Sequence, residues 1–315
     1  MLNNSIFTAF LELWQKICFF CGSDKTKKNG QKRNKQTYKC LSCGRQFSDR
    51  KIDDNQLKTD YIEGKQTLRQ LSEKHGVCVK TIWNHLGAMR HIRKISSAKE
   101  VVVLMDTTYW GRDFGLMIIK DAFRNKILWY KFVRNETVAD YKEGVDWLRE
   151  HDFKIYGIVC DGMRGLFKEF RYYRVQMCQF HQMMIVRRYL TNSPDLQASI
   201  ELLALSKRLS RMDEIEFRKS LEDWYLRWDD FLKERTTSRG HSQFTHQNVR
   251  KAYSSIKYYM PFLWTCEHYP ELKIPNTNAG IESLNAKIKT MLRVHSGISK
   301  DRRIRLIKEY IAMYY

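Results

Sequence analysis

The sequence predicts an α/β fold, in which a mixed β-sheet flanked by helices follows two small N-terminal modules. Four of the eight cysteines form two closely spaced pairs near the N-terminus, and a helix–glycine–helix pattern comes after them. From residue 99 onward, short apolar runs alternate with amphipathic helical stretches. We therefore expect three parts, with boundaries at residues 1–50, 51–98 and 99–315.

The composition indicates a folded, strongly basic protein. The 315 residues include 56 Lys and Arg against 35 Asp and Glu, which gives a net charge of +21, and 43% of them are hydrophobic. No apolar run approaches the roughly 20 residues that a membrane-spanning helix needs. A basic folded chain most often meets a polyanion such as nucleic acid, although lysines spread evenly over a solvated surface would give the same total.

The first residues, MLNNSIFTAFLELWQK, lack a signal-peptide cleavage pattern and suit a short amphipathic helix. A zinc ribbon follows, because Cys18 and Cys21 form one CxxC unit, and Cys40 and Cys43 form another after eighteen residues. Four thiolates make a closed tetrahedral site, so we expect one structural zinc per chain that supplies roughly 10 kcal/mol of folding energy. This use of cysteine fits a reducing cytoplasm, where we expect the protein to associate with the nucleoid.

The segment between the cysteine pairs is rich in lysine. Its charges suit contacts with DNA phosphates, although a merely solvated loop would look the same. The candidate DNA-binding residues here are Lys27, Lys28, Lys32 and Arg33.

Residues 67–94 predict a helix-turn-helix. Gly76 permits the positive φ of the turn, and Val77 and Val79 are expected to pack inward. An ordinary helical hairpin is the alternative, but the neighbouring basic ribbon favours DNA binding. The residues expected to face a major groove are Lys80, Thr81, Asn84 and His85.

The third part begins with the strand VVVLMDTTYW, whose apolar run ends at Asp106. Two more strands, a helix and the strand KIYGIVC follow, and the last leads directly into Asp161; YRVQMCQFH is expected as a fifth strand. If the two aspartates converge at about 4 Å, they repel by roughly 4 kcal/mol at an effective dielectric of 20. A divalent cation relieves that repulsion, so we expect two catalytic Mg²⁺ ions, or Mn²⁺ in their place. The alternative is that each aspartate only caps a strand-to-loop turn.

A helix that Asn278 can cap supplies a third acid, Glu282. Asn285 and Lys289 follow it at three and seven residues' spacing and fall on the same side of the helix, so that a carboxylate, an amide and an ammonium form one stripe. A solvated polar face would show the same pattern.

These stretches together resemble the bacterial DDE transposases of the Mutator-like insertion-sequence 256 family, in its zinc-ribbon variant. The matching segments are MDTTYWG, IVCDGMRGL, VQMCQFHQMMIVRRYL and NTNAGIESLNAKIK. The resemblance implies an RNase H-like mixed sheet with an all-helical insertion at about residues 190–273. The stretch SRGHSQFTHQ itself is typical of a loop. The resemblance also implies that Asp106, Asp161 and Glu282 are the catalytic, Mg²⁺-binding acids and that Lys289 is the basic residue of the motif.

Cys178 and His181 match the C-x-x-H signature of that family. Two ligands at this spacing could bind zinc, but no second pair stands near them in the sequence. We therefore favour a buried thiol and a hydrogen-bonded histidine beside the site, with Asn285 in a similar supporting position.

The predicted function is that of an insertion-sequence transposase. It would bind double-stranded DNA at the terminal inverted repeats of its element, cut it and join it to target DNA, as a homo-oligomer on paired ends and without a membrane partner. Two alternatives stay open: a DNA-binding regulator derived from a transposase, and an RNase H-like nuclease or resolvase without strand transfer.

Overall fold

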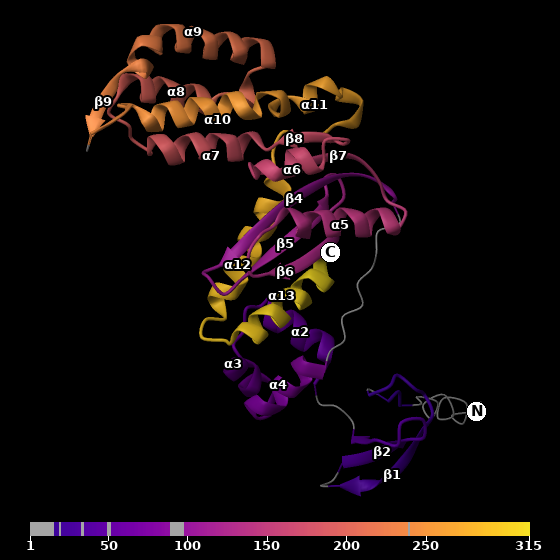
Figure 1. Ribbon diagram of the computed structural model, residues 1–315. Coiled ribbons are helices and arrows are strands. Elements are labelled where there is room, and N and C mark those ends of the chain that lie inside the picture. The colour runs from indigo at the N-terminus through magenta and orange to yellow at the C-terminus, as the bar shows by residue number, and fades with distance from the viewer. Residues whose placement is uncertain (1–15, 19, 33–34, 49–51, 89–97, 239) are drawn as a thin grey trace, which may run out of the picture. The chain divides into compact units, whose positions relative to one another are not determined.

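The computed structural model describes residues 16–18, 20–32, 35–48, 52–88, 98–238 and 240–315 (Figure 1). The predicted N-terminal helix and Arg33 lie outside these residues. The chain divides into two compact units, Met1–Arg90 and His91–Tyr315, and each is described by itself. Within the described ranges, no helix is both long enough and apolar enough to cross a membrane.

The first unit begins with a three-stranded antiparallel sheet in the order β1–β2–β3. Its strands are β1 (Thr26–Lys32), β2 (Lys35–Cys40) and β3 (Gln46–Ser48). The basic segment between the cysteine pairs is thus largely the β1–β2 hairpin. Lys27 pairs with Lys39 and Lys28 with Tyr38, so the two neighbouring lysines of β1 point to opposite faces.

Among the described residues of this unit, three helices follow the sheet: α2 (Asp54–Ile62), α3 (Leu68–His75) and α4 (Val79–Ala88). Thr67 and Gln70 form a capping box at the start of α3, and Gly76 ends it with φ of 61°. The prediction that Val79 packs inward is wrong, because its side chain is 42% exposed. Val79 is the first residue of α4, one turn before the buried face that starts at Ile82.

The second unit is built on a five-stranded mixed sheet in the order β6–β5–β4–β7–β8. Strands β4, β5 and β6 form an antiparallel meander, and β7 and β8 run parallel to β4. The predicted mixed sheet is therefore present. Its strands are β4 (Glu100–Trp110), β5 (Phe114–Asp121), β6 (Ile127–Val133), β7 (Lys154–Cys160) and β8 (Arg174–Met177).

Helices account for most of the remaining residues. They are α5 (Val138–Glu150), α6 (Arg164–Glu169), α7 (Gln179–Leu190), α8 (Gln197–Lys207), α9 (Glu214–Lys233), α10 (Gln247–Leu263), α11 (Thr265–His268), α12 (Ala279–Val294) and α13 (Lys300–Tyr314), with 3-10 turns at Leu209–Arg211 and Pro270–Leu272. The fifth strand was predicted too long: it ends at Met177, and the next residues begin α7.

Helices α5 and α12 cover opposite faces of the sheet (Figure 1). A Cβ on Gly144 of α5 would lie 2.5 Å from Ile119 Cδ1, and one on Gly280 of α12 would lie 3.1 Å from Leu104 Cδ1. Ile119 pairs with Met105, whose side chain points to the opposite face from Leu104. The two glycines therefore allow both helices to approach the sheet closely, one on each side.

Helices α7 to α10 lie side by side as a bundle, and its buried side chains continue the core on the α5 face of the sheet (Figure 1). The prediction that this insertion is all-helical is wrong in one place. Two strands, β9 (Arg235–Ser238) and β10 (His241–Phe244), form an antiparallel hairpin where a loop was expected. The β-branched Thr236 and Thr237 favour a strand, and Gly240 adopts the positive φ of 78° at the turn.

Candidate functional site

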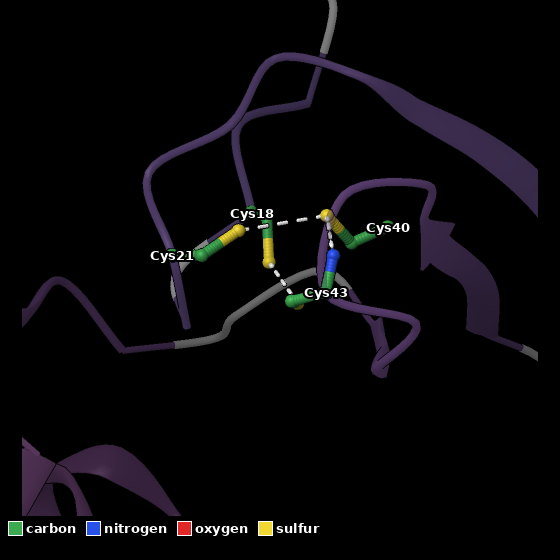
Figure 2. Close-up of side chains that lie close together, drawn as sticks. All are labelled: Cys18, Cys21, Cys40 and Cys43. Atoms are coloured by element: carbon green, nitrogen blue, oxygen red, sulfur yellow. Dashed lines mark hydrogen bonds between the residues drawn. The ribbon is translucent and has the colours of Figure 1, made fainter.

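The four paired cysteines converge on one point (Figure 2). The sulfurs of Cys18 and Cys43 are 3.6 Å apart, as are those of Cys21 and Cys40. A disulfide would bring two sulfurs to about 2.05 Å. Four sulfurs at about 2.3 Å from a zinc ion would instead lie about 3.8 Å from each other. The cluster is therefore suited to hold a zinc ion.

Two glycine turns shape this cluster. Gly22 and Gly44 directly follow the second cysteine of each pair and have φ of 73° and 71°. The N–H of Gly22 donates to the carbonyl of Cys18, and the N–H of Gly44 donates to that of Cys40. Because a side chain disfavours this positive φ, glycine is needed at both positions.

The proton balance of the cluster suits a cation. The pKa of Cys40 is lowered to about 6, first because the backbone N–H of Cys43 donates to its sulfur. The pKa of Cys21 is raised to about 12 although the backbone N–H of Ser23 acts to lower it, since burial and the other three cysteines favour its thiol form. The raised pKa of Cys21 means that the cluster without metal retains a proton, which a bound divalent cation would displace.

Asp106 and Asp161 lie at the same edge of the central sheet. Leu104 of β4 pairs in parallel with Val159 of β7, and each aspartate comes two residues later. Asp161 follows the end of β7 and accepts a hydrogen bond from the backbone N–H of Met163 at 3.1 Å. The buried run of β4 ends at Asp106 as predicted, but the strand itself continues along β5 to Trp110.

Helix α12 brings Glu282 to this edge. Asn278, which precedes the helix, makes no capping bond with its side chain, contrary to prediction. Its Nδ2 instead donates to the carbonyl of Met105 at 3.0 Å. One turn after Glu282, Asn285 Nδ2 donates to Asp106 Oδ2 at 2.9 Å. Asn278 and Asn285 therefore fix the helix against β4, beside Asp106.

Neighbouring acids act electrostatically on Asp106. The pKa of Asp106 is raised to about 8, first by burial and then by repulsion from Asp161, Glu136 and Glu282. Glu136 is a fourth carboxylate that the sequence analysis missed. It precedes α5, accepts a hydrogen bond from Tyr141 at 2.5 Å, and has a pKa that is raised first by burial. Its segment, RNETVADY, carries only the signal of a helix start, so no sequence pattern pointed to a site.

The C-x-x-H residues lie beside the acids. Cys178 is buried and directly precedes α7, and its backbone N–H donates to the carbonyl of Cys160 at the end of β7. His181 lies in the first turn of α7, with Nδ1 4.0 Å from Glu282 Oε1. Cys178, His181 and Glu282 form a group whose ligand atoms all lie within 4.8 Å of one another.

The predicted DNA-binding residues fall on several surfaces. Lys27, Lys28 and Lys32 are exposed on β1, as are Lys80 and Asn84 on α4. The imidazole of His85 instead contacts Asp54 of α2 at 2.7 Å, and Thr81 contacts the thiol of Cys78 at 3.3 Å, so both side chains are engaged inside the helical unit.

Lys289 is exposed and lines a groove of about 640 Å³ beyond Asp106 along β4. The groove combines cationic and aromatic side chains, which suits a sugar–phosphate backbone. Its charged and aromatic lining consists of Tyr109, Trp110, Lys289, Arg293, His295 and Arg303.

No protein-family model matches the chain, and no curated protein does. Among solved structures, the chain is similar to the Drosophila P element transposase strand transfer complex, with a TM-score of 0.39 and 10% sequence identity over 82% of this chain and 91% of that one. A similarity of this size does not by itself establish a shared fold or activity.

The cysteine geometry predicts that Cys40→Ser removes one tightly bound zinc per chain, because it takes away one of the four sulfurs that make the closed site. Metal analysis of freshly purified protein measures the loss. Cys266→Ser, which changes a cysteine outside the cluster, should leave the zinc content unchanged. Equal zinc in Cys40→Ser and the unaltered protein would contradict the assignment.

The raised pKa of Asp106 predicts how stability depends on pH in the absence of divalent cations. The ordinary value is 3.8 and the folded value is about 8, so the folded state binds the extra proton between these pH values. The contribution of Asp106 is thus fully present below about pH 4 and is lost as the pH rises to about 8. Asp106→Asn should flatten the fall in the free energy of unfolding from pH 5 to 8 by a few kcal/mol, on the order of one kcal/mol per pH unit.

Chemical denaturation at a series of pH values measures this slope. Asp195→Asn, at an exposed position, is the matched control and should keep the slope of the unaltered protein. If Asp106→Asn keeps that slope as well, Asp106 does not carry the raised pKa.

Proposed function

We propose that the protein is a DDE transposase that binds the ends of its own element, cuts the DNA and transfers the strand to target DNA. The observations that support this proposal are that Asp106 and Asp161 follow paired residues of β4 and β7, and that the pKa of Asp106 is raised to about 8, first by burial and then by repulsion from acids that include Asp161 and Glu282. A carboxyl group whose charged form is opposed by neighbouring acids favours binding of divalent cations over a purely structural role.

The order of elements supports an RNase H-like core. Three antiparallel strands, a helix, a strand, a helix and a further strand follow one another from β4 to β8. Strands β4 and β7 pair in parallel as far as Leu104 and Val159, and Asp106 and Asp161 each come two residues after this last pair. A helix packed on the sheet far later in the chain adds the third acid, as the resemblance to DDE transposases implies.

The donor set fits Mg²⁺, because it consists of carboxylate oxygens at an edge where both Asp106 and Glu282 are partly exposed. Asp106, Asp161 and Glu282 would hold two such ions, which when bound activate an attacking oxygen and stabilise a leaving oxygen at a phosphodiester. Asn285 keeps Asp106 oriented through its 2.9 Å hydrogen bond. Lys289 would position phosphate in the groove, and Glu136 adds negative charge next to the first two acids.

The reaction that these residues support has two steps. Water attacks a phosphodiester and frees a 3′-hydroxyl, and that hydroxyl then attacks a phosphodiester of the target DNA. Both steps displace an oxygen at phosphorus, so one carboxylate site serves both. We further propose that the protein acts as a homo-oligomer on paired ends, as the resemblance implies.

DNA recognition is assigned to the first unit. Exposed lysines on the β1 strand of the ribbon, together with Lys80 and Asn84 on α4, offer phosphate and base-edge contacts. The net charge of +21 favours association with DNA over most other partners.

The catalytic assignment predicts that Asp106→Asn, Asp161→Asn and Glu282→Gln each lower cleavage of an end-containing duplex by at least about 100-fold, because each removes charge from the same cation site. DNA binding should stay nearly unchanged, and combined substitutions should cost little more than one alone. Mg²⁺-dependent nicking in a gel assay measures the rate, with Asp195→Asn as the control.

Each outcome of this assay identifies a class of protein. Cleavage followed by joining to target DNA supports a transposase, cleavage without joining indicates a nuclease, and binding without cleavage indicates a regulator. Cleavage at the normal rate by Glu282→Gln would overturn the assignment of the third acid.

Phosphate contacts by the ribbon predict a salt effect. Replacing Lys27 and Lys28 by Gln should reduce the slope of log affinity against log salt by about one, because the two side chains point to opposite faces of β1 and the one that contacts a phosphate contributes about 0.9. Fluorescence anisotropy with element-end DNA measures this slope. Replacing the exposed Lys207 and Lys219 of the second unit is the matched control. An unchanged slope in the ribbon variant would show that its lysines are only solvated.

A further inference from the structure

We propose that Cys178, His181 and Glu282 form a second metal site, which binds one ion of the Zn²⁺ class and is separate from the cysteine cluster of the ribbon. The three ligand atoms lie within 4.8 Å of one another. They come from the start of α7 and the first turn of α12, two elements that the fold brings together only in the complete second unit.

Two of the three ligand atoms lack any other partner. His181 Nδ1 and Glu282 Oε1 are both buried, and neither has a hydrogen-bond partner among the described residues. They are 4.0 Å apart, which is too long for a hydrogen bond between them. Nitrogen and oxygen ligands of one tetrahedral ion, each at about 2.1 Å from it, lie about 3.4 Å apart. A shift of about half an ångström would therefore satisfy both atoms with one ion.

The third ligand atom, the sulfur of Cys178, has a fixed position. Cys178 is fully buried, and the backbone N–H of Asn278 donates to its Sγ at 3.3 Å. The sulfur of Cys40 in the ribbon receives the same kind of bond from the N–H of Cys43, at 3.5 Å. Cys178 directly precedes α7 and His181 lies in its first turn, so both ligands stand at the same end of that helix.

The mixture of donors selects the metal. A sulfur, an imidazole nitrogen and a carboxylate oxygen suit Zn²⁺, whereas Mg²⁺ takes oxygen ligands almost alone. Three protein ligands leave a fourth position for water or another oxygen. The side chains of His181 and Glu282 are 26% and 33% exposed, so this position can be reached from solvent.

The position of Glu282 links the two sites. Its Oε1 faces His181, which leaves Oε2 for the site shared with Asp106 and Asp161. An ion on Cys178 and His181 would thus fix the rotation of the Glu282 carboxylate. This link alone rests on the proposed function, whereas the metal site itself rests only on the local geometry.

The test is the zinc content and the sulfur coordination of the full-length protein, purified and dialysed without added zinc. If both sites are filled, we expect two zinc ions per chain, and X-ray absorption at the zinc edge should report a mean of about 2.5 sulfurs per zinc, the average of four and one. Cys178→Ser and His181→Gln should each leave one zinc with about four sulfurs. Cys266→Ser is the control and should retain two.

A complementary variant, Cys40→Ser, removes the zinc ion of the ribbon. This variant should keep one zinc with about one sulfur and one histidine in its coordination shell. If Cys178→Ser does not fold, His181→Gln, at a partly exposed position, decides the same question. One zinc per chain with four sulfurs in the unaltered protein would overturn the proposal, since His181 and Glu282 would then form only a distant pair. No DNA cleavage enters these measurements, so they stand apart from the test of the transposase assignment.

Discussion

Asn278 joins three segments that are far apart in the sequence. Its side chain donates to the carbonyl of Met105, directly before Asp106, and its backbone N–H donates to the sulfur of Cys178, at the start of α7. Both bonds are buried, so they are not exchanged for bonds to water. The position of α12, and with it that of Glu282, depends on this residue more than on any helix cap. The position of Glu282 relative to Asp106 therefore depends on an uncharged residue, Asn278.

The positive net charge of the chain contrasts with the negative charge of the carboxylates at one edge of its sheet. The net charge of +21 favours a polyanion such as DNA, yet Asp106, Asp161, Glu282 and Glu136 would repel any phosphate brought close to them. Burial keeps Asp106 partly protonated near neutral pH, which lowers that repulsion only in part. Cations between the carboxylates would remove the remainder. The positive charge of the chain thus favours DNA as a partner, whereas the carboxylates at the edge of the sheet require cations.

Features that depend on local spacing could be predicted from the sequence. The two CxxC units converge because a tight turn with a following glycine is encoded within a few residues, and the strands that lead to Asp106 and Asp161 follow from their apolar runs. Features that depend on packing between distant segments could not. Glu136 reaches the acids only because Tyr141 and the sheet hold it there. Glu282 lies about a hundred residues beyond His181, so the sequence offered two metal ligands where the structure brings three together.

The bond between Asn278 and Met105 spans 173 residues, and that between Asn285 and Asp106 spans 179. Closing loops of this length costs conformational entropy before any contact repays it, so such contacts form late in folding. During synthesis at about 5–20 residues per second, roughly 100 residues still have to be added after Cys178 before Asn278 exists, which takes on the order of 5–20 s. A nascent chain can therefore build its central sheet while it still lacks the third acid. Its acidic edge is completed only after the segment with Asn278, Glu282 and Asn285 has been made.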